Sequence, residues 1–122
     1  MEEIVIYEKP TCSKCRVAIQ LLDASGRPFR RVRYHDDRLS KAKLKSLVTK
    51  LGLPVRQIVR TKEPLYKELD IDVSNMGDDE VIALLAANPE LLERPILEYG
   101  DRAVLGRPTE NVAMFLKELS HT

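Results

Sequence analysis

The order of apolar and polar residues predicts a strand, a helix and a strand in the first third of the chain. Residues 3–7 form a short apolar run rich in β-branched side chains, which is typical of a buried strand. From Ser13 onward apolar residues recur at helical spacing, and the expected stripe consists of Val17, Ile19, Leu21 and Leu22. Residues 28–36 predict the second strand. One helix between two strands favours parallel pairing through a right-handed crossover.

The middle of the chain is predicted to be helical. Ser40 precedes an amphipathic stretch over residues 41–51 and Gly52 follows it, which are common start and stop signals of a helix. Residues 53–76 contain two prolines and short apolar clusters, so we expect short helices and turns there. Residues 77–92 predict one further helix, whose acidic first turn suits the positive end of the helix dipole.

The last third of the chain predicts a β-hairpin followed by a helix. Strands are expected over residues 96–99 and 103–105, on either side of a turn at Gly100 and Asp101. Pro108 stands at a favourable first position for the final helix. The residues expected to face inward from that helix are Val112, Phe115, Leu116 and Leu119.

These elements together predict an α/β protein with a thioredoxin-like fold. A βαβ half and a ββα half share one four-stranded mixed sheet in that fold. Here a helical insertion over about residues 38–92 separates the two halves. We expect a single domain over residues 1–122, because the length fits one domain and no linker, repeat or low-complexity tract interrupts it.

Composition and charge exclude several classes of function. The net charge is +1, aromatic residues make up 5% and tryptophan is absent, so we expect no direct nucleic-acid partner. No apolar run approaches the roughly 20 residues that span a bilayer, so no membrane partner is expected. The acidic start of the chain does not read as a signal peptide. We therefore expect a cytoplasmic protein, and structural disulfides are rare in that compartment.

Two cysteines, Cys12 and Cys15, lie three positions apart directly after the first predicted strand. A C-x-x-C pair beside a βαβ pattern indicates redox chemistry. A structural zinc site needs about four nitrogen or sulfur ligands. The only other candidates are His35 and His121, and neither has the paired spacing of a zinc finger. We therefore expect no metal.

The position of Cys12 favours a reactive thiolate. It lies at or near the N-cap of the first helix, where free amides and the helix dipole stabilise negative charge. Lys14 and Arg16 add positive charge. We therefore assign Cys12 as the nucleophile and Cys15, one turn further on, as a possible resolving thiol. The alternative, that both cysteines are small core residues, is disfavoured because the flanking residues are polar.

Three arginines extend this interpretation. Arg94-Pro95 opens the third predicted strand, where a thioredoxin-like fold carries a proline that faces the cysteines and is often cis. Arg107-Pro108 follows the fourth strand, and Arg60 lies in the insertion. Guanidinium groups bind tetrahedral oxyanions through paired hydrogen bonds. If the three arginines converge above the helix N-terminus, they form an oxyanion pocket over the thiol. Taken alone, each arginine is better explained as a solvated surface charge, and the pocket is favoured only because both Arg-Pro pairs lie at strand ends expected near Cys12.

The segments PTCSKCR, LLERPIL and GRPTENV, together with the helical insertion, resemble the ArsC family of glutaredoxin-linked arsenate reductases. The resemblance covers essentially the whole chain. It implies a thioredoxin-like fold in which Cys12 attacks arsenate and Arg60, Arg94 and Arg107 hold the oxyanion. Glutathione and glutaredoxin, or thioredoxin, would then supply electrons and release arsenite, with no bound cofactor.

Two residues depart from that branch of the family. Glu8 stands where its members have a histidine near the thiol, and an inward-pointing carboxylate there would raise the pKa of the thiol. Cys15 stands at a position without cysteine in that branch, and it would permit a Cys12–Cys15 disulfide reduced by thioredoxin or glutaredoxin. Two alternatives therefore stay open. One is a redox-switch regulator similar to Spx, which binds the RNA polymerase α-subunit, and the other is a general thiol-disulfide reductase.

Overall fold

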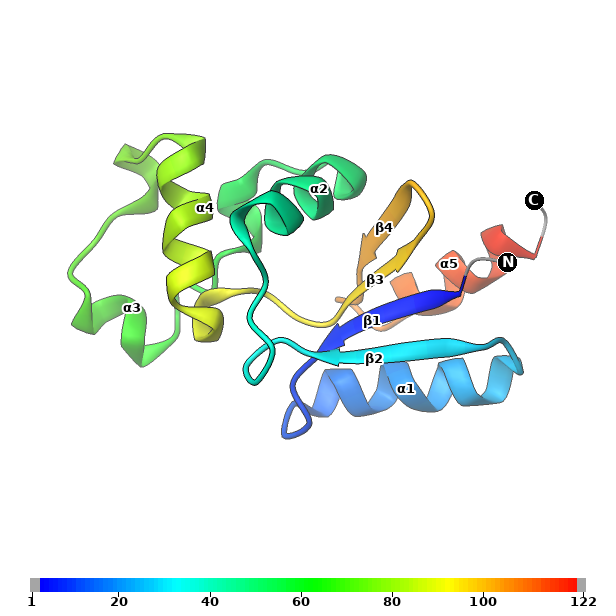
Figure 1. The fold of residues 1–122 in the computed structure, drawn as a ribbon. Helices are drawn as coiled ribbons and strands as arrows, with labels where there is room; N and C mark the ends of the chain where they lie inside the picture. The colour runs from blue at the N-terminus through cyan, green and yellow to red at the C-terminus, as the bar shows by residue number, and fades with distance from the viewer. Residues whose placement is uncertain (1–2, 121–122) are drawn as a thin grey trace.

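The computed structural model describes residues 3–120 and contains one four-stranded mixed sheet (Figure 1). β1 (Ile4–Glu8) pairs in parallel with β2 (Phe29–Arg33). β1 also pairs antiparallel with β3 (Ile96–Tyr99), which pairs antiparallel with β4 (Arg102–Leu105). The order across the sheet is β2-β1-β3-β4. The predicted mixed sheet and the predicted hairpin are confirmed.

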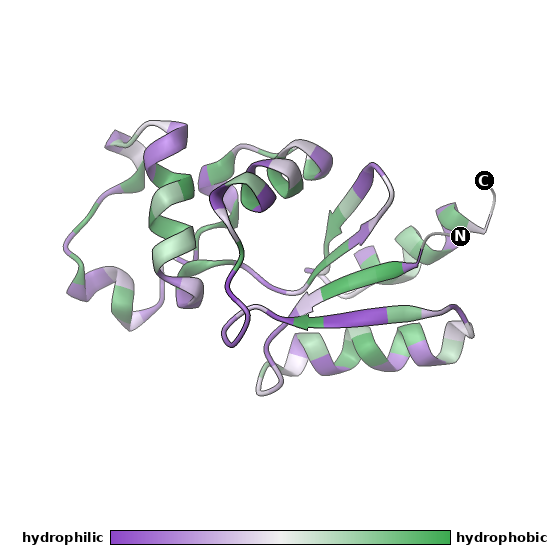
Figure 2. Ribbon diagram, in the orientation of Figure 1, coloured by the Kyte–Doolittle hydropathy of each residue, from purple (hydrophilic) through white to green (hydrophobic). Residues whose placement is uncertain are grey.

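β1 is central in the sheet and is buried on both faces. Ile4 and Ile6 pack with α1 (Ser13–Ser25) and α5 (Glu110–Leu119), whereas Val5 belongs to the core shared with the helical insertion. Burial on both faces explains why the strand reads as a continuous apolar run rather than as an alternating one. Figure 2 shows the contrast with β2, which is largely hydrophilic. Because β2 is an edge strand, its arginines discourage pairing with another chain.

The helical insertion lies at the end of the sheet where β1 ends and β3 begins (Figure 1). Its α-helices are α2 (Lys41–Leu51), α3 (Pro64–Glu68) and α4 (Asp78–Ala87). Short 3₁₀ helices span Val55–Ile58, Val73–Asn75 and Pro89–Leu91. Within residues 3–120, no helix is both long enough and apolar enough to cross a bilayer.

The predicted boundaries of α2 are confirmed by its caps. The Ser40 hydroxyl accepts a hydrogen bond from the Lys43 backbone amide at 3.0 Å, which satisfies one of the free amides of the first turn. Gly52 ends the helix with a φ of 67°, a conformation that favours glycine.

The two later helices are shorter than the sequence predicts. α4 ends at Ala87 instead of continuing to residue 92, because Asn88 precedes Pro89 and a residue before proline is disfavoured in a helix. α5 begins at Glu110 rather than at Pro108. Pro108 instead belongs to a turn, in which its carbonyl accepts a hydrogen bond from the Asn111 amide at 3.0 Å.

The buried face of α1 also differs from the predicted stripe. Cys15, Ala18 and Leu22 are fully buried, and their i, i+3, i+7 spacing places them on one face toward the sheet. Val17 lies off that face and is 38% exposed, so its predicted inward position is wrong. The other members of the predicted stripe, Ile19 and Leu21, are half-buried at its edges.

A buried carboxylate joins the insertion to the sheet. Glu98, on β3, accepts hydrogen bonds from the Tyr7 hydroxyl at 2.6 Å and from the Lys43 ammonium at 2.9 Å. Lys50, on the same helix as Lys43, also binds this carboxylate. Burial opposes ionisation, but the hydrogen bonds from Lys50, Tyr7 and Lys43 outweigh it and lower the pKa of Glu98 from 4.5 to about 2. The ionised carboxylate therefore holds α2 against the sheet.

Replacement of Glu98 by glutamine should lower the free energy of unfolding by ~2 kcal/mol near neutral pH, because it leaves partly buried lysines without their counter-charge. The folded-state pKa of about 2 lies below the ordinary value of 4.5, so the carboxylate stabilises the fold fully above pH 4.5. This stabilisation is lost as the pH falls from 4.5 toward 2. Urea unfolding over that pH range measures the difference in free energy of unfolding between wild type and Glu98→Gln. A gap between the two proteins that does not change with pH would contradict this role.

Candidate active site

Cys12 is the N-cap residue of α1, as predicted. Its backbone is extended, with φ −83° and ψ 123°, and its carbonyl accepts the first hydrogen bond of the helix from the Arg16 amide at 3.1 Å. The Cys12 amide donates to the Lys9 carbonyl at 3.0 Å, which closes the turn between β1 and α1. The end of the central strand therefore delivers the sulfur to the positive end of the helix.

The surroundings of Cys12 favour its thiolate form. Burial of the side chain opposes ionisation. Hydrogen bonds from the backbone and side chain of Cys15, a hydrogen bond from the Lys14 backbone and the charge of Arg107 outweigh burial and hold the pKa of Cys12 below its ordinary value. The sulfur is therefore available as a nucleophile.

Cys15 has the opposite character. It is fully buried and Cys12 is only 9% exposed, so the expectation that the polar flanking residues would keep both thiols out of the core is wrong for both residues. Cys15 occupies the sheet-facing side of α1, and Cys12 is covered at the N-cap although the residues around it in the turn are exposed. Burial, the hydrogen bond and charge of Cys12 and the charge of Glu8 raise the pKa of Cys15 to about 12. Cys15 therefore remains a thiol beside the Cys12 sulfur.

Glu8 is a fully buried carboxylate at the end of β1. Its Oε2 lies 3.1 Å from Arg31 Nε and 3.7 Å from Arg33 Nε, both on β2. The side chain points inward, and its charge contributes to the raised pKa of Cys15. The expected effect of an inward Glu8 therefore falls on Cys15, whereas the pKa of Cys12 is lowered by its other neighbours.

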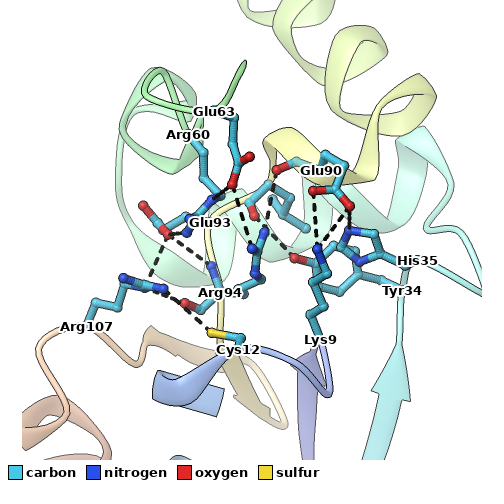
Figure 3. A network of polar contacts seen from close by, with 11 residues as sticks. Lys9, Cys12, Tyr34, His35, Arg60, Glu63, Glu90, Glu93, Arg94 and Arg107 are labelled. Atoms are coloured by element: carbon cyan, nitrogen blue, oxygen red, sulfur yellow. Dashed lines mark hydrogen bonds and ion pairs between the residues drawn. The ribbon is translucent and has the colours of Figure 1, made fainter. Parts of the chain in front are cut away.

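Two of the three predicted arginines lie at the thiol (Figure 3). Arg107 Nη2 is 3.6 Å from the Cys12 sulfur, and its Nε donates to the Arg94 carbonyl at 2.6 Å. Arg94 is 6% exposed, and its Nη1 is 3.5 Å from the Glu90 carbonyl oxygen. Burial opposes the charge of Arg94, but Tyr34 and the Cys12 sulfur raise its pKa, which keeps the guanidinium charged beside the thiol.

A hydrogen bond and a close contact of Gly106 join the two loops that carry these arginines. The Arg94-Pro95 peptide bond is cis, as expected, and the Arg107-Pro108 bond is cis as well. The Gly106 amide donates to the Pro95 carbonyl at 2.8 Å. A Cβ on Gly106 would lie 2.7 Å from Pro95 Cγ, so only glycine permits this close approach. The approach sets Arg107 next to Arg94.

Arg60 reaches the same region through backbone pairing. The Arg60 amide donates to the Leu91 carbonyl at 2.7 Å, and the Glu93 amide donates to the Ile58 carbonyl at 2.8 Å. These bonds join the segment of Arg60 to the segment that leads into β3. The Arg60 side chain, however, contacts two carboxylates, with Nε 2.9 Å from Glu63 and Nη1 2.6 Å from Glu93.

Glu93 connects Arg60 to the arginines at the thiol. Its Oε1 also lies 3.2 Å from Arg107 Nε and 3.3 Å from the Arg94 backbone amide. Glu63 Oε1 is 3.8 Å from Arg94 Nη2. An open cavity of about 460 Å³ lies against this network, and Arg60, Glu63, Glu93 and Arg107 line it.

The sequence interpretation missed both carboxylates. A local signal was present, because Glu63 follows Arg60 at the i, i+3 spacing and Glu93 directly precedes Arg94. Residues 3–120 contain no cluster of three His, Cys, Asp or Glu side chains suited to a metal ion. His121, which was considered as a zinc ligand, lies outside the described residues.

Several known proteins are similar to this chain in sequence and in fold. The ArsC family model matches residues 7–115. An arsenate reductase of Neisseria meningitidis is 41% identical over 95% of this chain and 100% of its own length. An arsenate reductase of Haemophilus influenzae is 38% identical over 93% of this chain and 98% of its own. The structure of an arsenate reductase from Vibrio cholerae superposes with a TM-score of 0.87 at 40% identity, covering 93% of this chain and 97% of that one.

The fold and the thiol at a helix N-terminus define a thioredoxin-like protein, which confirms the predicted fold class. Within that class, the chain belongs to the ArsC family. The resemblance drawn from the sequence motifs is therefore confirmed.

Iodoacetamide near neutral pH should modify Cys12 at least ~100-fold faster than Cys15, because the thiolate is the reactive form. Cys15 combines full burial with a pKa of about 12. Mass spectrometry of peptides from a time course measures the two rates. In urea-unfolded protein, which serves as the control, both cysteines should react alike. Equal rates in the native protein would contradict the difference between the two thiols.

Proposed function

We propose that the chain is a thiol-dependent arsenate reductase that converts arsenate to arsenite. The observation that carries the proposal is the Cys12 sulfur, with its lowered pKa, 3.6 Å from the Arg107 guanidinium. A nucleophile beside fixed positive charge suits an anionic electrophile, whose own charge would otherwise repel a thiolate. The relatives named as arsenate reductases support the same substrate.

The first step is attack of the Cys12 thiolate on arsenic. A sulfur–arsenic bond forms, and one arsenate oxygen takes up protons and leaves as water. Arg94 and Arg107 hold the remaining oxygens and offset their charge, since both guanidinium groups lie at the sulfur. Arg60 is the third oxyanion ligand in this proposal, recruited from its contacts with Glu63 and Glu93.

The second step reduces arsenic by two electrons, and two routes balance chemically. In one, an external thiol such as glutathione binds arsenic in place of a second oxygen, which leaves as water. A glutaredoxin thiolate then attacks the sulfur of that thiol, so a mixed disulfide forms and the electron pair of that sulfur–arsenic bond stays on arsenic. Water finally cleaves the bond between arsenic and Cys12, which releases arsenite and restores the Cys12 thiol. In the other, the Cys15 sulfur attacks the Cys12 sulfur. A Cys12–Cys15 disulfide forms, the electron pair of the sulfur–arsenic bond stays on arsenic, and thioredoxin or glutaredoxin later reduces the disulfide. Neither route needs a bound cofactor.

The state of Cys15 changes during the second route. Burial raises its pKa, and so do the hydrogen bond and the charge of the Cys12 thiolate. The thiolate charge is consumed when Cys12 binds arsenic, so one of the barriers to ionising Cys15 is then removed. The contact between the two cysteines also favours, as a second candidate function, reduction of disulfides without arsenate.

Cys12→Ser should reduce arsenate-dependent NADPH oxidation to background in an assay with glutathione, glutaredoxin and glutathione reductase, because a serine hydroxyl remains protonated. Cys15→Ser separates the two routes. Activity that persists in this variant indicates the external-thiol route, and its loss indicates the disulfide. Turnover by Cys12→Ser at the wild-type rate would exclude Cys12 as the nucleophile.

Arg94→Ala should raise the KM for arsenate by ~10-fold or more, since it removes charge-assisted hydrogen bonds to the substrate. The same variant should reduce a neutral disulfide, such as hydroxyethyl disulfide, with a smaller loss. Steady-state kinetics with both substrates provide the comparison. Equal losses would show that Arg94 supports the thiol alone, which would favour a general thiol-disulfide reductase.

A further inference from the structure

The arginine cluster already contains its own anions (Figure 3). Glu93 Oε1 lies 2.6 Å from Arg60 Nη1 and 3.2 Å from Arg107 Nε, and it also accepts from the Arg94 amide at 3.3 Å. Glu63 Oε1 binds Arg60 Nε at 2.9 Å. Two of the donors on Arg60 that could hold an oxyanion are therefore occupied by carboxylates.

The charges of the site balance without a substrate. Arg60, Arg94 and Arg107 contribute three positive charges, while Glu63, Glu93 and the Cys12 thiolate contribute three negative ones. A cluster of bare arginines would attract any oxyanion strongly. A balanced cluster attracts one only if the oxyanion replaces a resident carboxylate.

The geometry allows that replacement at Glu93. One carboxylate oxygen bridges Arg60 and Arg107, and both arginines line the open cavity. The Glu93 side chain is 22% exposed, so it can turn toward solvent in the cavity. A tetrahedral oxyanion has several oxygens, so in place of the Glu93 carboxylate it can accept hydrogen bonds from Arg60 and Arg107 together, and Arg107 also lies 3.6 Å from the Cys12 sulfur.

We propose that Glu93, supported by Glu63, is a specificity-determining residue that competes with incoming oxyanions for Arg60 and Arg107. The competition keeps reversible oxyanion binding weak. Phosphate and sulfate, which form no stable bond to a thiolate, then fail to fill the pocket. Arsenate is retained because Cys12 captures it covalently. This inference rests on the proposed arsenate reduction for its purpose, but the competition itself is a property of the site.

Glu93→Gln keeps the shape of the side chain and removes its charge, so it tests the competition directly. Inorganic phosphate and sulfate serve as probes, and their affinity is measured as protection of Cys12 from iodoacetamide. We expect Glu93→Gln to tighten phosphate binding by ~10-fold, because a charge within hydrogen-bond distance of both arginines is removed. Glu63→Gln should tighten binding in the same direction, and Glu93→Asp, which keeps the charge, should remain weak.

Glu118→Gln is the matched control. Glu118 pairs with Arg102 at 3.2 Å on the surface, away from the thiol, and its loss should leave phosphate binding unchanged. If Glu93 merely positions the arginines, Glu93→Gln will bind phosphate as weakly as wild type or more weakly, and the proposal is overturned. Should Glu93→Gln fail to fold, the same comparison with Glu63→Gln decides the question.

Kinetics separate this proposal from the proposed function. In Glu93→Gln the KM for arsenate should fall while kcat does not rise, and phosphate should inhibit more strongly. If wild type lacks arsenate turnover but Glu93→Gln still binds phosphate more tightly, the competition stands and arsenate reduction fails. If wild type turns over arsenate and the variant binds phosphate unchanged, arsenate reduction stands and the competition fails. Neither result would overturn arsenate reduction and the competition at the same time.

Discussion

The negative charge on one sulfur is the interaction on which the rest of the site depends. Cys12 ends the loop after the central strand and begins α1, so helix amides meet its sulfur from one side. Arg107 meets it from another, at 3.6 Å. The first contact is local in the chain, whereas the second is not, because Arg107 comes from the far end of the hairpin. The sheet, which pairs β1 with β3 and β3 with β4, makes that meeting possible.

The helical insertion contributes the outer part of the site and is tied down separately. Glu98 binds Lys43 and Lys50 of α2, which fixes one side of the insertion to the sheet. Backbone bonds of Arg60 to Leu91 and of Glu93 to Ile58 fix the other side. The site thus combines a thiol on the βαβ half with arginines and carboxylates from the insertion and from the two ends of the β3–β4 hairpin.

The sequence predicted those features that depend on neighbours in the chain. Hydrophobic runs, caps at Ser40 and Gly52, and the turn at Gly100 marked the elements because each signal is local. The N-cap position of Cys12 followed from its place between a strand and a helix. The fully buried state of Cys15, the partners of Glu8 and the carboxylates on Arg60 depend on packing between distant segments, so local patterns could not predict them.

The most direct test is a pH titration of the Cys12 thiol in wild type and in Arg107→Ala. The ultraviolet absorbance of the thiolate reports its ionisation as the pH is raised. Cys15, with a pKa of about 12, does not interfere below that range. We expect Cys12 to titrate with a midpoint pH below the ~8.5 of a free thiol, and the midpoint pH to rise once Arg107 is removed. A wild-type midpoint at or above that of a free thiol would contradict it.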